Sequence, residues 1–163
     1  MTDDIVATYR GPARVMRRLL AGGDREGRAL AYLLAALIVL YIAQWPALSR
    51  AGVLDETIPL GQRMFAAFLG VLALLPAFYL IAALSRLLCR VFGGRGSWSG
   101  SRIVLFWALL AVTPVMLLRG LVAGFLGPGP ALIAANIAAF AVFGWFWLSG
   151  LAVAEFPEAG DGA

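Results

Sequence analysis

The sequence contains no histidine and no lysine, and Cys89 is its only cysteine. Without histidine the chain has no imidazole base, no histidine metal ligand and no Ser-His or Cys-His catalytic pair. Without lysine it can form neither a Walker A phosphate loop nor a Schiff base. These absences exclude most enzyme classes, and we expect no catalytic, cofactor-binding or metal-binding residues.

Charged residues are also scarce: they make up 13% of the 163 residues, whereas 62% are apolar. Soluble domains contain about 25% charged and about 45–50% apolar residues. A soluble domain of this length has too little interior to bury so much apolar surface. The composition therefore predicts a membrane protein.

Four long apolar runs account for this composition. At about 1.5 Å per helical residue, each run can cross a hydrocarbon core about 30 Å thick, the first with the help of its flanks. The runs are continuous, whereas a membrane β-strand alternates between its two faces. We therefore predict an all-α transmembrane bundle with four spanning helices, over residues 29–45, 64–88, 103–126 and 131–154. We expect Pro76 and Pro114 to kink the second and third helices, and the sequence leaves open whether the third run is one helix or two.

Arginine is distributed unevenly along the chain. Nine of the thirteen arginines lie before the first run or between the second and third, and Arg86, in the last turn of the second run, is counted with them as the tenth. Two lie between the first and second runs, and Arg119 lies within the third. Because positively charged loops stay in the cytoplasm, both termini and the second loop are predicted to be cytoplasmic. The start, MTDD, does not resemble a cleavable signal peptide. The predicted parts are a basic amphipathic segment (1–28), a transmembrane domain (29–154) and a short acidic tail (155–163) that contains Glu155, Glu158 and Asp161.

The basic segment contains a helix pattern of its own. Pro12 suits the first position of a helix, and Gly22 and Gly23 suit its end. Apolar residues fall on one face and Arg14, Arg17 and Arg18 on the other. We predict a short amphipathic helix that lies flat on the inner leaflet, with its guanidinium groups near anionic lipid head groups. Alternatively, the basic helix serves only as a topology signal, or it is a contact site for a soluble partner.

Residues 93–100 read GGRGSWSG, which is glycine-rich and basic like a phosphate-binding loop. The spacing does not match G-x-G-x-x-G, because Ser99 stands where the third glycine would be. It does not match G-x-S-x-G either, because Trp98 stands where the serine would be. We favour a structural role, in which glycines end the second helix, Ser99 or Ser101 caps the third and Trp98 lies at the membrane interface. The predicted lipid or partner contacts are Arg14, Arg17, Arg18, Arg95 and Trp98.

Arg119 is the candidate polar residue within the bilayer. Residues 103–118 correspond to about 24 Å of helix, which favours a guanidinium that extends to the outer head groups. The alternative is a substrate or ion role within the bundle, where Gln44, Asn136 or Thr113 could meet it. Gly120 and Gly124 form a G-x-x-x-G, a weak match in a chain with 19 glycines. The five tryptophans fall mostly where interfacial belts are expected, and we assign them no ligand: Trp45, Trp98, Trp107, Trp145 and Trp147.

The GGRGSW loop, the following helix with Thr113-Pro114 and the Trp-rich last helix ending at residues 151–155 resemble the Yip (Ypt-interacting protein) domain family. The chain is similar to a small bacterial member, over about residues 29–155. The resemblance implies a compact helical bundle with a cytoplasmic N-terminus. In eukaryotic relatives the family is associated with Rab-type GTPases, which we do not carry over because a bacterial cell lacks prenylated partners. The all-arginine, Ala- and Gly-rich composition indicates a GC-rich bacterial genome and hence the inner membrane.

Two functions fit these observations. The first is a non-enzymatic multi-pass membrane protein that organises lipid or protein partners at the cytoplasmic face. The alternative is a small transporter or channel subunit that acts as an oligomer. The partners expected are the lipid bilayer, anionic lipids and a membrane or cytoplasmic protein; a homo-oligomer is left open, and no nucleic acid is expected.

Overall fold

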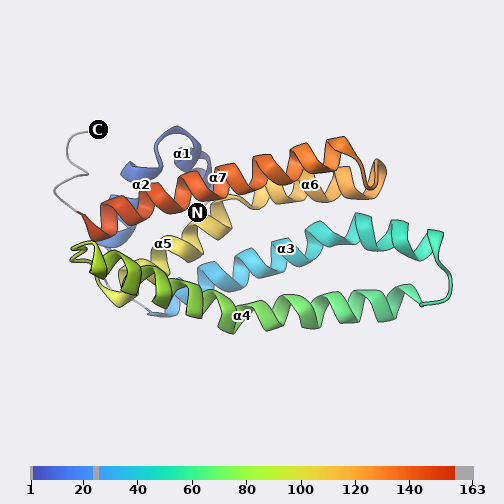
Figure 1. Cartoon of the computed structure of the whole chain (residues 1–163), viewed down its shortest axis with the longest axis horizontal. Helices are drawn as coiled ribbons and strands as arrows, with labels where there is room; N and C mark the ends of the chain where they lie inside the picture. The colour runs from blue at the N-terminus through green and yellow to red at the C-terminus, as the bar shows by residue number, and fades with distance from the viewer. Residues whose placement is uncertain (1, 24–25, 157–163) are drawn as a thin grey trace.

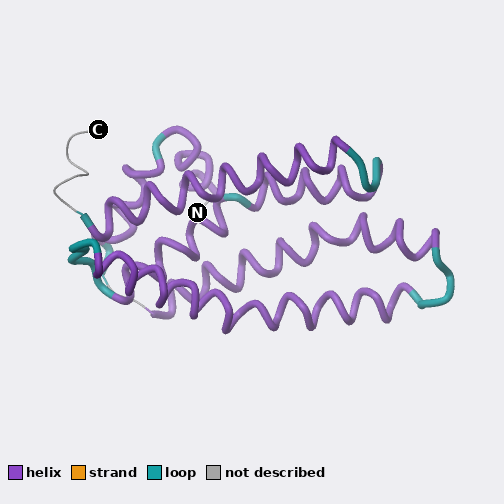
Figure 2. The backbone as a smooth tube through the Cα atoms, in the orientation of Figure 1, coloured by secondary structure: helices purple, strands orange, loops and turns teal. Residues whose placement is uncertain are grey.

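The computed structural model of this chain describes residues 2–23 and 26–156, which form helices and no strand (Figures 1 and 2). The all-α prediction is confirmed. The helices, in chain order, are α1 (Thr2–Arg10), α2 (Pro12–Ala21), α3 (Glu26–Leu54), α4 (Leu60–Val91), α5 (Trp98–Ala111), α6 (Thr113–Phe125) and α7 (Pro130–Glu155).

The four predicted membrane runs correspond to five of these helices. α3, α4 and α7 are each long and apolar enough to cross a membrane. α5 and α6 are long and apolar enough only together, as one broken span. α3 continues through Pro46, and α4 continues through Pro76 rather than ending there. The structure therefore has up to four spans among its described residues, as the sequence predicted.

The third run is broken into α5 and α6, which meet at an angle of 43° next to Val112. Pro114 has no N–H and cannot donate to the carbonyl of Leu110, which would be its partner in a continuous helix. The hydroxyl of Thr113 donates to that carbonyl instead, at 2.7 Å. The expected effect of Pro114 is confirmed, and the neighbouring threonine satisfies the carbonyl that the proline leaves free.

The N-terminal helix α1 satisfies a second carbonyl at this break. The hydroxyl of Tyr9 donates to the carbonyl of Ala111 at 3.0 Å. One residue earlier in α1, the buried hydroxyl of Thr8 accepts a hydrogen bond from the indole N–H of Trp107 at 3.1 Å. α1 is thus fastened to α5 by two polar contacts about one helical turn apart on α5.

α5 is the centre of the bundle. Residues 103–112 are each at most 4% exposed, and α1, α2, α3, α4 and α7 all pack against this helix. The ring of Trp107 packs edge-on against Tyr32, with the ring centroids 5.0 Å apart. Trp107 therefore belongs to the core, which corrects its expected place in an interfacial belt. Its position follows from α5 being covered on every side.

α3 and α6 approach each other so closely that their backbones touch. A Cβ atom on Gly120 would lie 1.9 Å from the carbonyl oxygen of Ala43, and one on Gly124 would lie 2.3 Å from Cβ of Pro46. Glycine is the residue that allows two membrane helices to approach in this way. The weak G-x-x-x-G match is therefore the contact surface between α6 and α3.

The loop between α3 and α4 is closed by Asp55. Its carboxylate accepts hydrogen bonds from the hydroxyl and the backbone N–H of Thr57, and it pairs with Arg63 at 2.6 Å. These contacts, with the Thr57 hydroxyl first, lower the pKa of Asp55 from 3.8 to about 2. A lowered pKa stabilises the loop above about pH 4, and this contribution is lost as the pH falls towards 2.

We expect Thr57→Val to raise the pKa of Asp55 from about 2 towards 3.8, because the hydroxyl that donates to the carboxylate is removed. Carboxyl ¹³C shifts of the full chain in micelles, followed against pH, would measure the change. Thr57→Ser is the control and should keep the low value. An unchanged pKa in the valine variant would contradict the assignment.

Candidate functional site: a cleft lined by arginines

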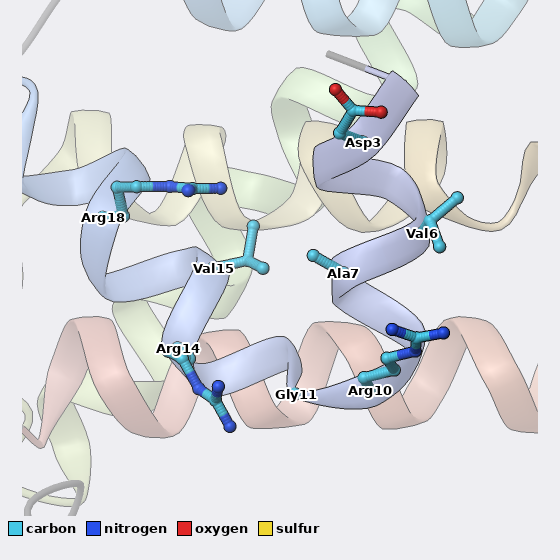
Figure 3. A pocket seen from close by; sticks show the side chains of 8 residues that line it. All are labelled: Asp3, Val6, Ala7, Arg10, Gly11, Arg14, Val15 and Arg18. Carbon is cyan, nitrogen blue, oxygen red and sulfur yellow. The ribbon is translucent and has the colours of Figure 1, made fainter.

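An open cleft of about 550 Å³ lies between α1 and α2. The two helices are joined by a tight turn at Gly11, whose N–H donates to the carbonyl of Ala7 at 3.0 Å. Because Pro12 follows directly, α1 ends there and α2 begins. The side chains that line the cleft are drawn in Figure 3: Asp3, Val6, Ala7, Arg10, Gly11, Arg14, Val15 and Arg18.

Charge is divided between the two ends of this arginine cleft. In Figure 3, Arg10 and Arg14 lie near the Gly11 turn, whereas Asp3 and Arg18 lie at the other end. Arg18 forms an ion pair with Asp4. Arg10 and Arg14 are exposed, and neither forms an ion pair or hydrogen bond with the residues that the structure describes. The turn end of the cleft is thus the electropositive end.

The apolar face of α2 packs against protein. Val15, Met16 and Leu19 are buried in the hydrophobic core, where α2 contacts α7 and α5. The predicted amphipathic helix is present with the predicted start at Pro12, but its apolar face does not lie on the leaflet. The reason is that α5 needs cover on this side, and α2 supplies it.

The end of α2 is fixed by an arginine from α3. Gly23 has a φ of 77°, which stops the helix as the two glycines predict. The guanidinium of Arg28 donates to the carbonyl of Leu19 at 2.7 Å and to that of Gly23 at 2.9 Å. Helix-end carbonyls that would lack partners are thereby satisfied, and the hairpin is tied to the start of α3.

The glycine loop, residues 92–97, connects α4 to α5 at the same end of the bundle as the N-terminal hairpin (Figure 1). Gly93, with a φ of 85°, ends α4 as predicted. The cap of α5 is Ser97, whose hydroxyl accepts from the N–H of Gly100 at 2.9 Å. The expectation that Ser99 or Ser101 caps this helix is wrong, because the chain turns into the helix already at Trp98.

The glycine loop surrounds a carboxylate of its own chain, that of Glu155 at the end of α7. One carboxylate oxygen accepts from Arg86 at 2.9 Å and from the N–H of Gly96 at 3.0 Å; the other accepts from the hydroxyl of Ser101 at 2.7 Å. The Glu155 side chain is 0% exposed and that of Arg86 is 12% exposed. In addition, the N–H of Arg95 donates to the backbone carbonyl of Glu155 at 2.9 Å.

Two glycines leave the space for this carboxylate. A Cβ on Gly94 would lie 2.9 Å from Oε2 of Glu155, and one on Gly96 would lie 2.7 Å from the same oxygen. The loop thus binds an anion as its composition suggests, but the anion is internal. Glu155 is the last residue of α7 and not part of a free tail; residues 157–163 lie outside the described residues.

Arg119 lies between α6 and α7, half-buried. Its Nε donates to Oδ1 of Asn136 at 2.5 Å, and the pair borders a shallow groove of about 330 Å³. Of the three expected partners, Asn136 is the one that it meets. The Thr113 hydroxyl donates at the α5–α6 break instead, and Arg119 forms no hydrogen bond with Gln44.

The predicted contact residues fall into two groups at one end of the bundle. Arg14 and Arg18 line the arginine cleft, and Arg17 is exposed elsewhere on α2. Arg95 and Trp98 are exposed at the glycine loop and the start of α5. Residues 2–23 and 26–156 contain no cluster of three or more His, Cys, Asp or Glu that could hold a metal ion.

Sequence reasoning missed Arg10 and Glu155. The spacing of four residues from Arg10 to Arg14 to Arg18 was a usable signal for the cleft, although Gly11 and Pro12 interrupt the helix. Glu155 gave no local signal, because its partners lie 54 to 69 residues earlier in the chain.

Comparison with known proteins gives one finding. The model of the Yip1 domain family matches residues 6–162 of the chain, which includes the arginine cleft apart from Asp3, the glycine loop and Glu155. Neither the curated proteins nor the solved structures gave a match.

Proposed function

The chain belongs to the Yip1 domain family, and from this premise we propose that it is a non-enzymatic multi-pass membrane protein that organises lipid or protein partners at the cytoplasmic face of a bacterial inner membrane. The observation that carries the proposal is the arginine cleft, where Arg10 and Arg14 are exposed and have no partner among residues 2–23 and 26–156. A fixed cationic surface beside a membrane attracts anionic head groups or acidic protein segments.

The distribution of charge along the bundle supports the proposed orientation. The N-terminal hairpin, the glycine loop and the ends of α3, α4 and α5 beside them carry nine of the twelve arginines that the structure describes, and they lie at one end of the bundle. The loops between α3 and α4 and between α6 and α7 lie at the other (Figure 1). By the positive-inside rule, the arginine-rich end is cytoplasmic. The 26 residues of α7 would be about 39 Å long, about 9 Å more than the hydrocarbon core, so this helix reaches into a head-group region.

The proposal is tested by the lipids that stay with the full chain when it is purified from its own membrane in a mild detergent. We expect anionic phospholipid to be enriched about threefold or more over the bulk membrane, and the enrichment to fall when salt screens the arginines. A lipid composition equal to that of the bulk membrane at low salt would contradict the lipid part of the proposal. An unrelated four-span protein carried through the same purification is the control.

The alternative function, a transporter or channel subunit acting as an oligomer, is supported by the Arg119–Asn136 pair, because polar pairs inside a bilayer often mark a pathway. Flux of small ions into proteoliposomes, measured against protein-free vesicles, distinguishes the two. Flux above that background would favour the alternative, and its absence would favour an organising role.

A further inference from the structure

We propose that the arginine cleft is a binding site for one anionic phospholipid, in which Arg10 and Arg14 bind the phosphate and the apolar walls of α1 and α2 contact the adjoining part of the lipid. This inference rests on the proposed function and narrows it. A cationic surface that attracts any anion becomes one site with a defined ligand.

The phosphate is assigned to the turn end of the cleft. Arg10 and Arg14 lie there on either side of Gly11, and the guanidinium of Arg14 lies within 4 Å of the position of a Cβ on Gly11 (Figure 3). Neither guanidinium has a carboxylate partner among the described residues, and each presents a planar donor fork that matches phosphate oxygens. In Figure 3 the two groups point away from each other, and both exposed side chains would turn towards a bound phosphate. The other end already holds Arg18 paired with Asp4, and the carboxylate of Asp3 would repel an anion there.

The lipid part of the ligand is assigned from the walls. Ala7 and Val15 face each other across the cleft (Figure 3), and Val6, on the outer side of α1, is the third apolar side chain that borders it. The volume of about 550 Å³ lies within the range of small-molecule sites and is far larger than one phosphate ion needs. A free phosphate would leave these walls in water, whereas the glycerol and first methylenes of a phospholipid would cover them.

The backbone around the site is held in place before any ligand binds. Tyr9 and Thr8 fasten α1 to α5, and buried Met16 and Leu19 fasten α2 to the core. A ligand therefore does not need to order the two helices, which keeps the entropic cost of binding small.

The experiment is native mass spectrometry of the full chain in detergent with equal amounts of phosphatidylglycerol and phosphatidylcholine. We expect one phosphatidylglycerol bound with about tenfold preference, and the double variant Arg10→Gln, Arg14→Gln to lose most of that preference. The matched control for each single variant, Arg10→Gln or Arg14→Gln, is Arg90→Gln, which removes one exposed charge outside the cleft and should change binding less than about twofold.

Three outcomes would overturn the inference. If Arg90→Gln lowers the preference as much as Arg10→Gln or Arg14→Gln does, the arginines act as a diffuse surface, and the proposed function stands without the cleft. If inorganic phosphate displaces the lipid completely, the ligand is a small phosphate compound. If the unmodified chain shows no preference for phosphatidylglycerol, both the cleft and the lipid part of the proposed function fail. Because the substituted arginines are exposed, we expect each arginine variant to give the same circular dichroism spectrum as the unmodified chain.

Discussion

Replacing Gly120 by alanine is expected to destabilise the bundle by about 3 kcal/mol or more, because the added methyl would overlap the backbone of α3. Its Cβ would lie 1.9 Å from the carbonyl oxygen of Ala43. A side chain can rotate away from such a clash, but a helix backbone cannot. α3 and α6 would have to separate, which also removes the close contact of Gly124 with Pro46. The free energy of unfolding in bicelles, measured by steric trapping, gives the effect.

Gly144→Ala in α7 is the matched control. Nothing lies within 4 Å of a Cβ at that position. The substitution therefore changes only helix propensity, which favours alanine over glycine by up to about 1 kcal/mol. If Gly120→Ala were as stable as Gly144→Ala, the close crossing of α3 and α6 would not exist in the folded protein.

The second large effect is expected at Glu155. Glu155→Gln should cost about 3 kcal/mol, the lower end of the range for a buried ion pair that loses one partner, because Arg86 keeps a small exposure. The variant removes the negative charge that Arg86, the N–H of Gly96 and the hydroxyl of Ser101 surround. The same unfolding measurement would show it, and trypsin should then cut faster after exposed Arg95 as the loop loosens.

Two further variants separate the buried pair from a general charge effect. Asp55→Asn removes the carboxylate of an ion pair at the surface, where the Asp55 side chain is 47% exposed, and should cost much less than Glu155→Gln. Adding Arg86→Gln to Glu155→Gln should restore part of the lost stability, because the unpaired charge is then gone. If the two losses simply added, Glu155 and Arg86 would not be coupled.

What the sequence predicted well depends on long runs of one kind of residue. The four apolar runs predict α3, α4, α7 and the broken α5–α6 span, because a long continuous apolar run indicates a membrane helix without any knowledge of its tertiary contacts. Pro12, Gly22 and Gly23 similarly predict both ends of α2 from local chemistry. For Arg119, the sequence provided a short set of partners, but the rotation of α7 decides that Asn136 is the one.

What the sequence did not predict depends on contacts across the chain. α1 is a nine-residue helix, too short to be stable alone, and it forms because Thr8 and Tyr9 reach α5. In the sequence, Glu155 cannot be distinguished from the acidic residues that follow it. Only the fold, which brings α4, the glycine loop and α5 around its carboxylate, shows that it is a buried residue. Tryptophan is a residue type typical of the membrane interface, but Trp107 is a core residue because α5 is covered on all sides.

The hydrogen bond from Tyr9 to Ala111 also determines the order in which the bundle can be completed. The two residues are 102 positions apart, and synthesis makes Tyr9 first. When α5 enters the bilayer, the carbonyl of Ala111 lacks a partner until the N-terminal hairpin arrives, and an unsatisfied carbonyl in lipid costs several kcal/mol. The hairpin is thus made before α5 but can reach its place only after α5, so this contact forms late although one of its two partners is made early.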